Sequence, residues 1–102
     1  MESVRDLLDA HDSARFPGGL SDDDEIAGAA LVLLDADIAG LAAAYLEQGG
    51  VLPLEQWRVL SECAAVARVV VPSLRGDAWV YFARLYALAQ AMLRGAPDLP
   101  TD

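Results

Sequence analysis

The stretch SDDDEIAGAALVLLDADIAGLAAAYLEQGG, residues 21–50, decides the fold that we predict from this sequence. Ser21 is a suitable helix N-cap, because its hydroxyl can accept a hydrogen bond from a free backbone N–H of the first turn. Gly49 and Gly50 supply the end, since glycine enters the left-handed cap conformation without strain. We therefore predict a central helix of about 27 residues, roughly 40 Å long at 1.5 Å per residue.

Two opposite sides of this predicted helix lack charge. Large apolar side chains recur at spacings of three and four residues and form a seam suited to packing against other helices. The seam consists of Ala27, Leu31, Leu34, Ile38, Leu41 and Tyr45. Mostly small side chains lie nearly opposite, where a second helix could approach closely. This small-residue face is our candidate dimer face, and it consists of Ala29, Leu33, Ala36, Gly40 and Ala43.

Three further helices flank the central one. The first is predicted at residues 3–14, with Ser3 and Asp6 in the positions of a capping box. The next is predicted at residues 53–71, where proline suits the first helical position and a second proline prevents continuation. The last, at residues 77–94, ends before a Gly- and Pro-containing segment. It carries an apolar arc of ten residues, wider than one neighbouring helix can cover.

The predicted fold class is all-α: an antiparallel helical bundle of one short N-terminal helix plus three longer helices. A chain of 102 residues is long enough for one hydrophobic core, so residues 1–95 are predicted to form a single helical domain. Residues 96–102 are polar and contain proline, which predicts a disordered C-terminal tail. The predicted core positions are Leu34, Leu41, Trp57, Leu60, Phe82 and Leu85.

Acidic residues dominate the first half of the chain. The formal net charge is −9, from 16 acidic and 7 basic side chains. Residues 1–50 hold 11 acids and 2 arginines, whereas residues 51–102 hold 5 of each. Binding to nucleic-acid phosphates needs a basic surface and is not expected. The acidic charge is compatible with a basic protein partner, but plain solubility is the interpretation that the charge alone favours. The candidate partner-binding residues are Asp22, Asp23, Asp24, Glu25, Asp35 and Asp37.

Composition also favours self-association. Hydrophobic residues make up 55% of the chain, and its mean hydropathy is +0.30, which is apolar for a small domain. Closed two-fold dimers are the commonest way to cover excess apolar surface, so we predict a homodimer through helices.

No residue pattern predicts a catalytic, cofactor-binding or metal site. The chain has one histidine, His11, and one cysteine, Cys63, too few for a zinc site. The acids of residues 22–25 diverge around a helix and cannot converge on one ion. Asp35 and Asp37 lie about 200° apart on a helix, so they cannot form a catalytic dyad by themselves.

Residues 26–46 are apolar enough to suggest a membrane span, but Asp35 and Asp37 would each cost about 2.5–3.5 kcal/mol at a bilayer centre. We therefore expect no membrane insertion. A single cysteine and the lack of a secretory signal predict a cytoplasmic protein. The absence of lysine and asparagine indicates a GC-rich, bacterial genome.

From these observations we predict that the protein is a small acidic, non-enzymatic protein-binding module. A regulator or immunity-type protein that masks a basic partner is the concrete form we expect. A structural homo-oligomer is the first alternative, and a helical enzyme with a site between subunits is the second.

Overall fold

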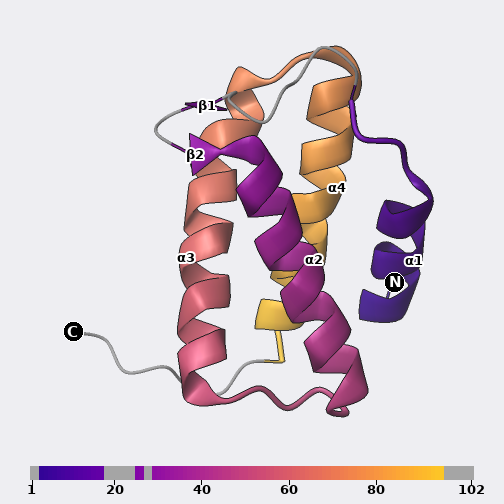
Figure 1. Cartoon of the computed structure of the whole chain (residues 1–102), viewed down its shortest axis with the longest axis vertical. Coiled ribbons are helices and arrows are strands. Elements are labelled where there is room, and N and C mark those ends of the chain that lie inside the picture. The colour runs from indigo at the N-terminus through magenta and orange to yellow at the C-terminus, as the bar shows by residue number, and fades with distance from the viewer. Residues whose placement is uncertain (1–2, 18–24, 27–28, 96–102) are drawn as a thin grey trace.

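The computed structural model describes residues 3–17, 25–26 and 29–95, and shows the predicted all-α bundle (Figure 1). Its helices are α1 (Val4–Ser13), α2 (Leu31–Glu47), α3 (Leu54–Val70) and α4 (Gly76–Leu93), with a 3₁₀ turn at Val71–Ser73. Two short strands, β1 (Glu25–Ile26) and β2 (Ala29–Ala30), precede α2. Among the described helices, none has the length and apolarity needed to cross a membrane.

Helix α4 is the centre of the bundle, because it packs against α1, α2 and α3 (Figure 1). Three neighbours explain why its apolar arc is so wide. The arc's buried side chains are Tyr81, Phe82, Leu85, Leu88, Ala89 and Met92. Most of the apolar surface that seemed to demand a second subunit is therefore covered within one chain, while Trp79 stays 48% exposed.

The central helix is shorter than predicted. It begins at Leu31, and Glu25–Ile26 instead pair antiparallel with Ala29–Ala30. The N-cap predicted at Ser21 did not suffice to fix the start of α2, because an N-cap stabilises a helix by only about 0.5–2 kcal/mol. Gly28 within a helix would cost about 1 kcal/mol relative to alanine. The predicted cap residue, Ser21, lies outside the described residues.

The end of α2 is as predicted. Gly49 and Gly50 adopt positive φ angles of 67° and 88°. The Gly50 N–H donates to the Tyr45 carbonyl at 2.8 Å, and the Gly49 N–H donates to the Leu46 carbonyl at 3.3 Å. These two bonds form a Schellman motif, which satisfies free carbonyls at the helix end and lets the chain turn back into α3.

The other helix boundaries agree with the prediction to within one residue. In α1 the Ser3 hydroxyl accepts from the Asp6 N–H at 3.1 Å, and the Ser3 N–H points to the Asp6 carboxylate at 3.5 Å. This is the predicted capping box. Asp77 lies within the first turn of α4, after Gly76.

The core contains five of the six predicted positions. Leu34, Trp57, Leu60, Phe82 and Leu85 are buried. Leu41 is only partly buried, and the prediction that it would be nearly buried is wrong. Ala42, four residues after Ile38, occupies the fully buried position instead. The buried stripe of α2 therefore shifts slightly around the helix toward its C-terminal end.

Candidate functional site

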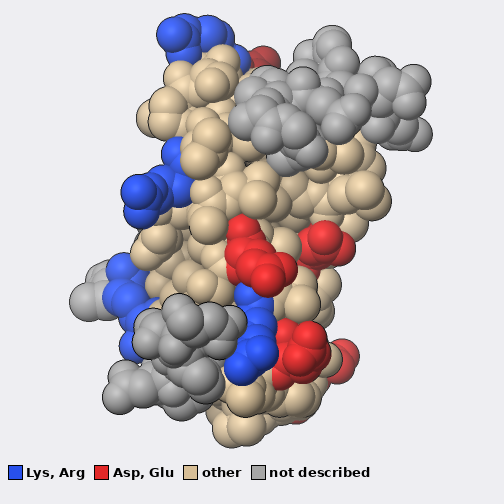
Figure 2. All heavy atoms as spheres, turned by 90° about the vertical axis from the view of Figure 1, so that its left-hand side faces the viewer, with Lys and Arg blue, Asp and Glu red and all other residues tan. Residues whose placement is uncertain are grey.

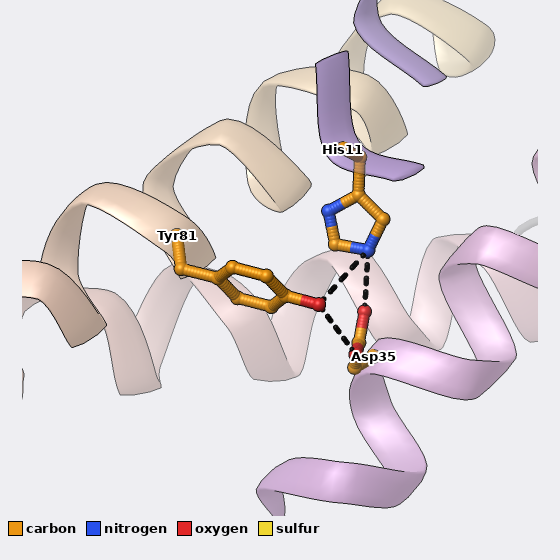
Figure 3. A network of polar contacts seen from close by, with 3 residues as sticks. All are labelled: His11, Asp35 and Tyr81. Carbon is orange, nitrogen blue, oxygen red and sulfur yellow. Dashed lines mark hydrogen bonds and ion pairs between the residues drawn. The ribbon is translucent and has the colours of Figure 1, made fainter. Parts of the chain in front are cut away.

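A network of three polar side chains joins α1, α2 and α4 (Figure 3). His11 Nε2 lies 2.6 Å from Asp35 Oδ1, and the Tyr81 hydroxyl donates to Asp35 Oδ2 at 2.8 Å. The Tyr81 oxygen also lies 3.3 Å from His11 Nε2. Both oxygens of Asp35 thus accept hydrogen bonds inside the domain, while its role in binding a partner stays a prediction.

The protons in this network can be assigned from its chemistry. An ionised carboxylate can only accept, so Nε2 of His11 carries the hydrogen that points to Asp35. Burial, the hydrogen bond to Asp35, and the charges of Asp35 and Asp12 raise the pKa of Tyr81 above its ordinary value. Tyr81 therefore stays protonated and keeps donating. Within the described part of the chain, the buried Nδ1 of His11 has no hydrogen-bond partner.

This network is placed to fasten α1, and two of its three residues are buried. His11 is 5% exposed and Tyr81 is 7% exposed. The nearest hollow is lined by Phe16, Tyr81 and Arg84 among others, but neither His11 nor Asp35 reaches it. A general acid or base must come within hydrogen-bond reach of the reacting group, and of these three side chains only Tyr81, whose pKa is raised, lines the hollow. The three groups instead stabilise the docking of α1 on the bundle.

Tyr81 makes a testable contribution to alkaline stability. Its folded-state pKa is raised, so its contribution is fully present below about pH 10, the unfolded-state value, and is lost as pH rises further. The chain has no lysine, so few other groups titrate in this range. We expect Tyr81→Phe to flatten the decline of the unfolding free energy between about pH 9.5 and pH 11.5.

Urea denaturation at stepped pH checks this expectation. Tyr86→Phe is the matched control, because the Tyr86 hydroxyl bonds only Gln90 on its own helix among the described residues. The control should decline as the wild type does. An equally steep decline in Tyr81→Phe would contradict the role given to Tyr81.

A second feature is an exposed surface between α2 and α3, which we call the α2–α3 face. Its apolar part is exposed, with Leu33 at 63% and Val69 at 59%. Between the two helices it is hollowed by about 280 Å³, with Leu34 and Cys63 among the lining residues. The α2–α3 face consists of Leu33, Asp37, Val59, Glu62, Val66 and Val69. Figure 2, which views the α3 side, shows red carboxylates near the middle of the face, with blue arginines beside and around them.

Asp37 and Glu62 place two carboxylates on this face. Both are exposed and line the hollow, one from each helix. Burial, and then the charges of Asp37 and Glu62, raise the pKa of the Cys63 thiol, which also lines the hollow. Within the described residues, neither carboxylate forms an ion pair or a side-chain hydrogen bond. Helix α2 contains no basic residue, whereas α3 carries exposed Arg58 one turn before Glu62.

The structure places the predicted site residues in different environments. Asp22, Asp23 and Asp24 lie outside the described residues, and Glu25 lies in β1 with its side chain undescribed. Asp37 is the one predicted partner-binding acid that is described as exposed. On the small-residue face, all members with described side chains are exposed, and Ala29 lies in β2 with its side chain undescribed. The exposed members are Leu33, Ala36, Gly40 and Ala43.

Residues of α3 were missing from the predicted site. Val59, Glu62, Val66 and Val69 follow one another at spacings of three, four and three, which places them on one side of a helix. That spacing was visible in the sequence. Only the packing of the opposite side of α3 shows that this stripe is left uncovered.

Comparison with known protein families, curated proteins and solved structures finds no match to this chain. Within the described residues, no group of His, Cys, Asp and Glu side chains is arranged to hold a metal ion. The function must therefore be argued from the geometry of the surface.

Proposed function

We propose that the protein is a small, non-enzymatic module that binds a basic partner protein through the α2–α3 face. The observation that carries this proposal is the exposed apolar surface around Leu33 and Val69, with the unpaired carboxylates of Asp37 and Glu62 within it. Burial of exposed apolar side chains would drive association. The two carboxylates would select a basic partner and weaken binding as salt is added.

A regulator or immunity-type protein fits this picture, since masking a partner requires a complementary surface and no catalytic group. We place the activity in the bacterial cytoplasm. A single free cysteine supports a reducing compartment, and the absence of lysine and asparagine supports a GC-rich bacterial genome.

Site-specific photo-cross-linking in the producing cell tests this proposal. A benzophenone amino acid replaces Val69 in the α2–α3 face or, as a control, Ala87, which is exposed on α4. We expect position 69 to cross-link a basic protein and position 87 not to do so. Adducts containing only a second copy of the chain, or identical adducts from both positions, would contradict the proposal.

A homodimer through the small-residue face is the second candidate. It is supported by the exposure of Leu33, Ala36, Gly40 and Ala43 on one side of α2. None of the described chain covers these positions, so a second copy has access to them. Their small side chains would let two helices approach closely.

Gly40→Glu tests this second candidate without disturbing the monomer. A Cβ atom added at Gly40 meets no atom within 4 Å. Replacing a mid-helix glycine should leave the monomer folded, and even stabilise it by roughly 0.5–1 kcal/mol. At a dimer interface the same glutamate would separate the subunits by steric and charge conflict. Sedimentation equilibrium showing a wild-type mass of 10.8 kDa at every concentration would exclude the homodimer.

A further inference from the structure

We propose that the hollow of the α2–α3 face receives one amphipathic helix of the partner, apolar toward Val59 and Val66 and bearing lysine or arginine on both flanks. This inference rests on the proposed function and specifies its partner. It follows from the shape of the hollow, the spacing of its apolar residues and the placement of its two carboxylates.

The size and position of the hollow suit a few side chains of a partner. Its volume of about 280 Å³ lies just below the range of about 300–1,000 Å³ that is usual for small-molecule sites. It lies open between two neighbouring helices, the arrangement in which grooves receive a third helix. A few apolar side chains of a partner would fill it, whereas a cofactor would be left largely exposed.

The apolar residues have a helical spacing. Val59 and Val66 lie seven residues apart, which is roughly 10 Å along the axis of α3. Two turns of a partner helix span the same length, so apolar residues at positions i and i+7 would meet both valines. Val69, one turn further, would extend the contact to a third turn.

The two carboxylates reach the hollow from different helices. Asp37 projects from α2 and Glu62 from α3. A helix lying between α2 and α3 would present one flank to each carboxylate, so basic residues on both flanks would be complementary. A second copy of this chain fits less well, because a two-fold axis brings the same surface to itself and sets like charges against each other.

A synthetic peptide provides the probe. The peptide is an amphipathic Leu/Lys helix of about 18 residues, long enough to form a helix once bound. Two peptides of equal length serve as controls: a Leu/Glu analogue, and a scrambled Leu/Lys sequence with the same composition but no apolar side. Binding is measured by fluorescence anisotropy and mapped by amide chemical shifts of the full-length protein.

Of the three peptides, we expect only the amphipathic Leu/Lys helix to bind. The largest amide chemical-shift changes should fall on residues 33–37 and 59–69. The double variant Asp37→Arg/Glu62→Arg should lose at least about tenfold in affinity for this peptide, and should gain affinity for the Leu/Glu analogue. The matched control Glu47→Arg/Glu55→Arg changes two other exposed acids of the same two helices, and should keep the wild-type preference.

The outcomes separate this inference from the proposed function. Equal binding of the scrambled peptide would mean that charge alone attracts the probe, which overturns the helix-in-groove inference and leaves a basic partner in place. Shifts centred on another surface, or no binding of any peptide, would also overturn it. A lack of specific cross-links from position 69 would overturn the proposed function itself.

Discussion

Phe82→Ala is expected to lower the free energy of unfolding by about 3–5 kcal/mol, the usual cost of emptying a buried aromatic position. The Phe82 side chain is 1% exposed, and its ring centroid lies 5.2 Å from that of Tyr81 and 6.1 Å from that of Phe16. Truncation would leave a cavity at the point where α4 meets the rest of the bundle. Because domains of this size are stable by only about 5–15 kcal/mol, this loss is large.

Urea denaturation followed by circular dichroism measures the effect. Trp79→Ala is the matched control, since it removes a larger ring from the same helix at a position that is 48% exposed. The control should change stability by only about 0.5 kcal/mol, as surface substitutions usually do. An equal loss of unfolding free energy in the two variants would show that α4 does not bury the Phe82 side of the helix in preference to the Trp79 side.

Asp35→Ala is expected to have the second largest effect, because it removes the shared acceptor of His11 and Tyr81. A buried polar group left without a partner costs about 1–3 kcal/mol, and His11 and Tyr81 would keep only their 3.3 Å contact with each other. The loss should be concentrated in α1, because His11 is the polar group of α1 in this network. Hydrogen exchange of α1 amides should therefore accelerate more than that of α3 amides.

The control for this substitution is Asp37→Ala, two residues away and exposed. It should leave both stability and exchange close to the wild type. Adding Tyr81→Phe to Asp35→Ala should recover part of the loss, since it removes one of the unpartnered groups. A loss no larger than that of Asp37→Ala would mean that the network contributes nothing to the docking of α1.

The exposed apolar surface has a different origin from the one that composition suggested. The ten-residue arc of α4 seemed to require a second subunit, yet three intramolecular neighbours cover most of it. The apolar surface that stays exposed includes Leu33 of α2 and Val69 of α3, as well as Trp79 of α4. Composition indicates how much apolar surface a chain has, but the packing of the helices decides which part of that surface stays exposed.

The sequence by itself determined most helix ends and the all-α class. The capping box at Ser3 and the Schellman motif at Gly50 each involve atoms no more than five residues apart, so the residues that form them can be read directly. The periodicity of α2 likewise predicted that Leu31, Leu34 and Ile38 would be buried.

Only the tertiary structure decided where α2 begins, what Asp35 does and which helix surface is left uncovered. The Asp35 network joins residues that are 24, 46 and 70 positions apart, and no local pattern links them. The predicted start of α2 depended on two local effects, the stabilising N-cap at Ser21 and the destabilising glycine at position 28. Each contributes only about 1 kcal/mol, which is too little to fix where the helix begins. The uncovered stripe of α3 depends on how the helix is rotated against its neighbours, and that rotation is set by burial of the opposite stripe around Trp57 and Leu60.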